Sequence, residues 1–443
     1  MRFFSKLELA LALGAIVSAA LLPTTAGAQG GFLEDRAPRE GPGFKVGRLV
    51  LHPGLSLQGG YDSNVFLQSS GEEGSFILRL EGYLDVATVG AVRRAQGEAN
   101  ALEPQKIEFR GGVGGRYYHY FSGRVADNVG ADANADFSYN PSKVFTLQLR
   151  DDFTRTIRPF SNPNTTSGTT ISYGRNINAA SLALVGRSKS QVLEGSVGYT
   201  NYVQLFDAGL YTYGNTMSHH VPVSLSWRFF PSSALVYTVE YINQTYLNPE
   251  QVLASPTSLS NNNRVLTLIG YNGAITERTL LTAMIGYTAG FYEAAQNFDA
   301  VIARVDLSWR PRATIVFTTG FDRNVHPSFI GNYTTINRLR ANARFTLAGA
   351  LDVGMNAWVS FDKSGPALSP DGAPIGNQLN REDTRLQAAL FAEYRFKAWL
   401  ALFSEIGYLA DFTDFRYLGT GPLIVPYANY QRFEAWLGLR VFY

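Results

Sequence analysis

Most of the chain consists of segments in which apolar and polar residues alternate one by one. In residues 129–139, the odd positions are apolar or aromatic, whereas Asp132, Asn134, Asp136 and Ser138 fill even ones. Successive side chains of a β-strand point to opposite faces, so this period of two predicts a strand with one apolar face. The pattern recurs in about eighteen segments of roughly ten to fifteen residues each. Residues 173–187 and 263–273 alternate poorly, and their register stays open.

The last segment, residues 433–443, alternates to the final residue. Phe433, Ala435, Leu437, Leu439, Val441 and Tyr443 share one face, opposite Glu434, Trp436, Gly438 and Arg440. About eleven residues suffice for a tilted strand to cross a bilayer. A strand that ends in an aromatic residue resembles the signal by which the barrel-assembly machinery recognises outer-membrane barrels. That resemblance implies an assembly signal at Phe433, Leu437, Leu439, Val441 and Tyr443. The edge strand of a soluble sandwich is the alternative.

The connections between the predicted strands alternate in length. Short turns are expected at Asn140-Pro141-Ser142, Gly186-Arg187-Ser188, Pro231-Ser232-Ser233, Arg310-Pro311-Arg312, Ala348-Gly349-Ala350 and Phe396-Lys397-Ala398. Longer polar loops are expected at 155–172, 204–216, 247–262, 363–381 and 413–427. Short turns at one rim and long loops at the other are typical of outer-membrane barrels, with the short side in the periplasm. The stretch 88–104 departs from this plan.

These features predict an all-β fold, a transmembrane antiparallel β-barrel of about 18 strands formed by residues 48–443. In lipid every strand needs a partner on both sides, so the sheet must close. A barrel of this size is too wide for side chains to fill and leaves an aqueous lumen.

The N-terminus predicts export. Residues 1–28 combine Arg2 and Lys6, an apolar run, and the small residues Ala26-Gly27-Ala28, as in a cleaved signal peptide. An uncleaved signal anchor is the alternative. Residues 29–47 are polar, lack a period, and are expected to form a periplasmic lead-in. The predicted location is the cell outer membrane, with its lipid as a partner.

Composition narrows the chemistry. Mean hydropathy is −0.07, which fits alternating strands better than spanning helices. A net charge of +2 without a Lys/Arg block gives no argument for nucleic acid as a partner. The chain has no cysteine and five histidines, none of which is spaced for a metal site or a catalytic triad. His326 is expected in a loop. We predict no enzyme, no metal and no cofactor.

One motif resembles a known family. Gly60-Tyr61-Asp62-Ser63-Asn64-Val65-Phe66 is similar to the opening motif of the putative β-barrel porin 2 family. The segments Phe229-Phe230-Pro231 and Trp309-Arg310-Pro311 are similar to its aromatic-proline turns. The resemblance implies export of a polysaccharide, an exopolysaccharide, with periplasmic export proteins as partners. A general porin for small solutes and a plugged structural barrel are the alternatives.

Position along each alternating segment, odd or even, predicts which side chains face the lumen. Tyr83, Tyr118, Tyr120, Tyr202, Trp358 and Trp436 are the candidate lumen aromatics. They would stack on the apolar faces of sugars, or else only fill volume.

Direction and parity together predict an arc of arginines at the periplasmic rim. Its members are Arg228, Arg310, Arg344, Arg395 and Arg440, near the C-terminal ends of the eighth, twelfth, fourteenth, sixteenth and eighteenth strands. Guanidinium groups stay charged and bind carboxylate or phosphate in a forked geometry. The arc would attract an anionic chain or a periplasmic partner. Alternatively, Asp306, Glu393 and Glu434 would neutralise it locally.

Overall fold

The computed structural model describes residues 43–88, 105–156, 174–207, 214–248, 260–294, 296–328, 333–368, 373–374, 376–416 and 429–443. Its strands form one antiparallel sheet. They are β1 (Phe44–Val46), β2 (Leu49–Asp62), β3 (Ser75–Thr88), β4 (Ile107–Tyr120), β5 (Asn128–Ser142), β6 (Phe145–Thr156), β7 (Arg175–Arg187), β8 (Leu193–Phe206), β9 (Thr216–Phe230), β10 (Ser233–Tyr246), β11 (Asn262–Thr276), β12 (Thr279–Tyr292), β13 (Phe298–Arg312), β14 (Ile315–Pro327), β15 (Tyr333–Leu347), β16 (Leu351–Pro366), β17 (Asn380–Lys397), β18 (Leu400–Phe412) and β19 (Tyr430–Phe442). No helix within these ranges is long and apolar enough to cross a membrane.

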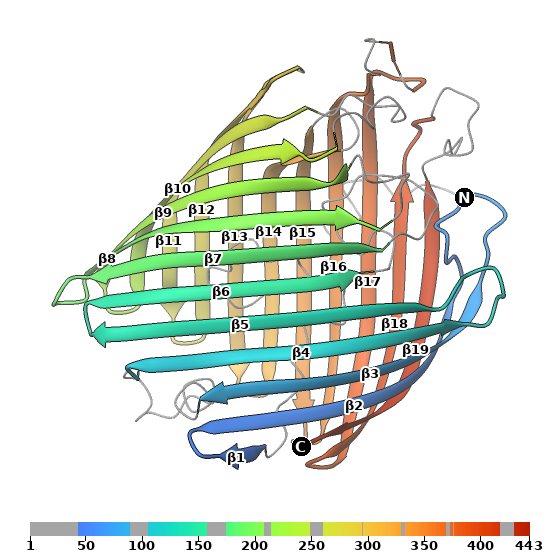
Figure 1. The fold of residues 1–443 in the computed structure, drawn as a ribbon, viewed down its shortest axis with the longest axis horizontal. Coiled ribbons are helices and arrows are strands. Elements are labelled where there is room, and N and C mark those ends of the chain that lie inside the picture. The colour runs from blue at the N-terminus through green and yellow to red at the C-terminus, as the bar shows by residue number, and fades with distance from the viewer. Residues whose placement is uncertain are drawn as a thin grey trace.

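The sheet closes on itself. Each strand from β2 to β19 pairs with its neighbours in sequence, and β19 pairs antiparallel with β2, from Glu434↔Asp62 to Phe442↔Gly54. Because β1 only pairs with the start of β2, the nineteen strands leave eighteen in the barrel wall. Strands of the near and far walls cross steeply in Figure 1, as expected for strands tilted against a barrel axis. The predicted all-β barrel of about 18 strands is confirmed.

The two rims of the barrel differ. We call the rim with the C-terminus the short-turn rim; its hairpin turns span 143–144, 188–192, 231–232, 277–278, 313–314, 348–350 and 398–399. The turn at 277–278 was not predicted from the sequence. Several predicted turn residues belong to strands instead, because β5, β13 and β17 run on to Ser142, Arg312 and Lys397. The opposite end is the long-loop rim, which includes the connections 63–74 and 367–379.

Register assigns each side chain to a face. Residues directly opposite one another across paired strands lie on the same face. The outer face carries exposed apolar side chains on most strands, for example Leu78 and Leu80 on β3 and Leu437 and Leu439 on β19. The inner face carries most of the charged side chains, many of them buried.

The two segments whose register was open are β7 and β11. Their alternation is weak because apolar residues occupy both faces. Ile177 and Val185 lie on the inner face of β7, and Leu266 and Leu268 lie on the inner face of β11.

The motif Gly60–Phe66 lies at the seam between the first and last strands of the wall. Arg432 of β19 donates hydrogen bonds to Asp62 of β2, with Nε 3.0 Å from Oδ1. Asn64 donates through Nδ2 to the carbonyl oxygens of Gln431 (2.9 Å) and Gln68 (2.8 Å). These contacts join the ends of the sheet, so the motif has a structural function in closure.

The predicted N-terminal segments lie mostly outside the described residues. Residues 1–28 and 29–42 are not among them. Within the expected lead-in, Phe44–Val46 form β1, and the Phe44 ring stacks on Tyr443 with ring centroids 4.0 Å apart.

Candidate functional site

The inner face of the wall is the candidate site, since a solute that passed through the barrel would meet it. Most of its charges form short chains across neighbouring strands. Arg116 of β4 lies between Glu81 (2.9 Å) and Asp132 (2.8 Å). Asp306 of β13 lies between Arg304 (2.6 Å) and Arg340 (2.5 Å). Such chains neutralise each other while keeping the wall polar.

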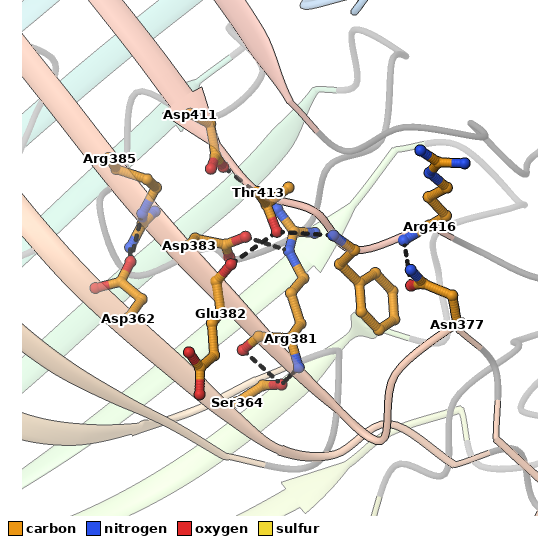
Figure 2. A network of polar contacts seen from close by, with 11 residues as sticks. Asp362, Ser364, Asn377, Arg381, Glu382, Asp383, Arg385, Asp411, Thr413 and Arg416 are labelled. Carbon is orange, nitrogen blue, oxygen red and sulfur yellow. Dashed lines mark hydrogen bonds and ion pairs between the residues drawn. The ribbon is translucent and has the colours of Figure 1, made fainter. Parts of the chain in front are cut away.

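A cluster of buried charges lies on β16, β17 and β18 near the long-loop rim (Figure 2). The Arg381 side chain is 1% exposed, with Nε 2.7 Å from Asp383 and Nη2 3.3 Å from Asp411. Arg385 is paired with Asp362, and both are buried. A buried ion pair depends on each partner, because removing one leaves an uncompensated charge.

The same cluster fastens two loops to the wall. Ser364 accepts a hydrogen bond from the Arg381 amide (2.9 Å), and Thr413 donates to the Glu382 carbonyl (2.7 Å). Asn377 and Arg416 exchange hydrogen bonds, with the Arg416 amide 2.7 Å from Asn377 Oδ1. The loops after β16 and β18 therefore meet at this point of the rim (Figure 2).

Sequence reasoning missed this cluster. Arg381 was assigned to a polar loop, although Arg381, Asp383 and Arg385 already show the alternation of a strand. What the sequence could not supply was the register that brings Asp362 of β16 and Asp411 of β18 beside them.

The five arginines of the predicted arc all lie near the short-turn rim, at the ends of β9, β13, β15, β17 and β19. Arg344 pairs with Asp352 at 3.0 Å. Arg395 and Arg440 share Glu393, at 3.4 Å and 2.7 Å. Arg228 is 4.0 Å from Glu194, which Arg187 binds at 2.6 Å. Among the described residues Arg310 has no ion pair and is exposed.

Only one of the three carboxylates that were expected to neutralise the arginine arc does so. Glu393 has the expected role. Asp306 instead binds Arg304 and Arg340, deeper in the wall. Glu434 lies 2.6 Å from Arg432, toward the other rim. Both were assigned to the arc from strand and parity alone, without their position along the strand.

The six candidate lumen aromatics lie on the inner face, and burial separates them. Trp436 (4% exposed) and Tyr118 (6%) pack with Ile77 and Phe403 in one cluster. Tyr120 is partly buried and packs against this cluster. These two rings fill space within the wall. Half-buried rings remain at Tyr83, Tyr120, Tyr202 and Trp358.

The histidines have different partners. His119 binds Asp127 on the outer face (2.8 Å), and His220 binds Glu240 on the inner face (2.8 Å). His326 belongs to β14, opposite Thr334, and the prediction of a loop there was wrong. The strand continues through Pro327, the last position of its ladder. Within the part of the chain that the structure describes, no three His, Asp or Glu side chains could hold a metal ion.

The predicted assembly signal lies on the outer face of β19. The side chains of Phe433, Leu437, Leu439, Val441 and Tyr443 are all exposed there. The Tyr443 amide also donates to the Pro53 carbonyl oxygen at 3.0 Å, which extends the seam to the last residue.

No protein-family model matches the sequence, and no curated protein matches it. Solved structures are similar at low identity. The FrpB iron transporter from Neisseria meningitidis (F3-3 variant) is 10% identical with a TM-score of 0.45, over 88% of this chain and 81% of that chain. The outer membrane protein OpdK from Pseudomonas aeruginosa is 8% identical with a TM-score of 0.41, over 89% and 99%. OccK2 (OpdF) from Pseudomonas aeruginosa, in complex with glucuronate, is 10% identical with a TM-score of 0.45, over 88% and 98%.

Proposed function

We propose that the chain is a channel of the bacterial outer membrane and that it exports an exopolysaccharide. The observation that carries the proposal is a closed wall with an exposed apolar outer face and a charged inner face. Soluble proteins rarely expose contiguous apolar surface of this kind. A sheet without free edges meets the requirement that lipid imposes on the backbone.

The height of the apolar band agrees with a membrane. On β13 the outward residues Val301, Ala303, Val305 and Leu307 lie between Asp299 and Trp309. Those ten residue steps span about 33 Å along the strand, which a tilt of roughly 40° reduces to about 25 Å. The apolar band of outer-membrane barrels is about as tall. Trp309 marks its short-turn side, and the hydrogen bond from Tyr287 to Asp299 (2.5 Å) marks its other side.

The inner face supports an aqueous lumen. Eighteen strands enclose more space than side chains fill, and ionised side chains line the wall on many strands. Export of a polysaccharide is supported by the resemblance of the Gly60–Phe66 motif and by the half-buried rings of Tyr83, Tyr202 and Trp358 on the inner face. A sugar chain offers apolar faces to such rings and hydroxyl groups to the charged neighbours.

The short-turn rim provides a candidate surface for a periplasmic partner or an anionic chain. Arg228, Arg310 and Arg344 are the exposed arginines of the arc, and Lys143, Lys189 and Arg278 add positive charge in the turns. We expect changing Arg228, Arg310, Arg395 and Arg440 together to Glu to reverse an anion preference of the reconstituted channel. Unchanged selectivity would remove this function from the arc.

Deletion of the gene tests the substrate. An exporter predicts that the strain loses surface polysaccharide while the uptake of small sugars and amino acids is unchanged. Normal surface polysaccharide with slower solute uptake would favour the general porin. Reintroducing the wild-type gene should restore the lost property.

A further inference from the structure

Arg338 of β15 is one of the buried arginines of the inner wall. It is 7% exposed, yet no carboxylate oxygen of the described residues lies within ion-pair distance of it. By contrast, Arg340 on the same strand and the buried Arg381, Arg385 and Arg432 of the inner wall each bind at least one carboxylate. A buried guanidinium is costly unless a partner compensates its charge.

The nearest carboxylate is turned toward another arginine. Asp322 of β14 lies directly across the ladder from Arg338. Its Oδ1 atom is 3.4 Å from Nη1 of Arg340 and accepts no hydrogen bond within the described structure. Arg338 thus has Asp322 as a neighbour without forming an ion pair with it.

The Arg338 guanidinium is held in place by a ring. It lies over Trp358 of β16, 5.5 Å from the ring centroid. The indole of Trp358 is itself fixed, because Nε1 donates to Gln387 of β17 at 2.9 Å. Nε of Arg338 is fully enclosed without a hydrogen-bond partner, whereas its two terminal nitrogens are not among the enclosed atoms. An oriented guanidinium of this kind binds an oxyanion with little loss of side-chain entropy.

A second cation lies farther toward the long-loop rim. Arg264 of β11 donates through Nη1 to the Val325 carbonyl oxygen (2.9 Å), and its Nε is buried without a partner. It has no ion pair among the described residues. The ladder between β13 and β14 ends at Ala303↔Arg323, whereas β14 pairs with β15 up to Pro327. The Arg264 side chain contacts β14 in this part, where β13 no longer pairs with it.

We infer that Arg338 is an anion-binding residue of the lumen, which binds a carboxylate or phosphate group of the transported solute. Arg264 is a second anion-binding residue for the same solute. This inference rests on the proposed channel and adds the charge of the substrate. An anionic group supplies the ion pair that Arg338 lacks among the described residues. Trp358 beside it offers a ring to the sugar that carries the group.

The test uses the folded full-length barrel in detergent, with glucuronate, glucose 1-phosphate and neutral glucose as probes. Saturation-transfer NMR measures binding whether or not the barrel conducts. Wild type should bind both acids and not glucose, and Arg338→Gln should weaken binding about tenfold, as expected for loss of a charged hydrogen-bond donor. Arg338→Lys should retain part of the binding. The control Arg150→Gln, an inner-face arginine that is paired with Asp152 at 2.5 Å, should bind as wild type does.

The outcomes separate the site from the channel. Binding of only one acid still supports the site and assigns it to carboxylate or to phosphate. Equal binding by wild type and Arg338→Gln, or an equal loss in Arg150→Gln, overturns the site even if the barrel conducts. Binding that depends on Arg338 in a barrel that never conducts keeps the site and overturns the channel. Heat-modifiable migration on gels should show that every variant is folded, and Arg338→Gln should melt no lower than wild type because no carboxylate loses its partner.

Discussion

Two adjacent glycines of β2 have opposite environments. Gly60 faces inward under Trp436, and a Cβ atom there would overlap the indole ring. That ring cannot move away easily, because it is buried and Arg79 lies over it, 4.3 Å from the ring centroid. Gly59 faces outward, and no atom lies within 4 Å of the place that a Cβ atom would take there.

We therefore expect Gly60→Ala to destabilise the folded barrel by about 1–3 kcal/mol, the usual cost of overpacking. Gly59→Ala is the matched control and should change the free energy of unfolding by less than about 0.5 kcal/mol. Urea unfolding in lipid vesicles measures both. Equal stabilities of the two variants would contradict the packing at the seam.

The buried cluster on β16, β17 and β18 gives a second prediction at this scale. Arg381→Met leaves Asp383 and Asp411 without their shared guanidinium, so we expect a loss of about 3–5 kcal/mol. Arg124→Met removes an exposed arginine (78% exposed) that binds Glu73 at 3.0 Å. Exposed pairs contribute about 0–1 kcal/mol. If the two variants unfold at the same urea concentration, the cluster does not hold the long-loop rim together.

At the scale of elements, the last strand carries most of the closure. β19 pairs with β18 along its length and with β2 from Glu434 to Phe442. Phe442 is buried on the inner face below Arg395, 4.4 Å from the guanidinium, while Tyr443 stacks on Phe44 outside. The final two residues thus contact both faces of the wall.

We expect Tyr443→Asp to lower the amount of folded protein in the outer membrane several-fold. The cost of a charge at the membrane interface is only about 0–1 kcal/mol, so the effect should arise from lost stacking and lost recognition during assembly. Tyr443→Phe keeps the ring and should assemble normally. Comparison of heat-modifiable bands in membrane fractions measures this, and wild-type levels of Tyr443→Asp would disprove it.

The sequence predicted the elements better than their mutual positions. Alternation located the strands because most of them have one apolar and one polar face, and it failed for β7 and β11, where both faces carry apolar residues. Parity also placed the lumen aromatics on the inner face. Which charges meet depends on register between strands, as the ion pairs of Asp306 and Glu434 show. The lack of an ion pair at Arg338 among the described residues has the same origin.

At the scale of the whole molecule, the lengths of the connections and the C-terminus predict one orientation. The short-turn rim should face the periplasm and the long-loop rim the cell exterior.

At the long-loop rim Asp127 lies between β4 and β5. Hydrogen bonds from Tyr117 and then His119 hold its pKa below the usual value.

Cysteine labelling can test this orientation, because the chain has no cysteine of its own. Arg124→Cys at the long-loop rim should react with an impermeant maleimide on intact cells. Lys143→Cys in a turn of the short-turn rim should react only after the outer membrane is permeabilised. The reverse pattern would invert the barrel and move the arginine arc to the cell surface.

The barrel should enclose an aqueous path through a membrane, and recording currents from the purified, folded protein in planar lipid bilayers tests this central claim most directly. We expect discrete steps of ion conductance, because eighteen strands leave a lumen and charged side chains line it. Insertion of folded, heat-modifiable protein that never changes the membrane current would contradict the channel and favour a plugged structural barrel.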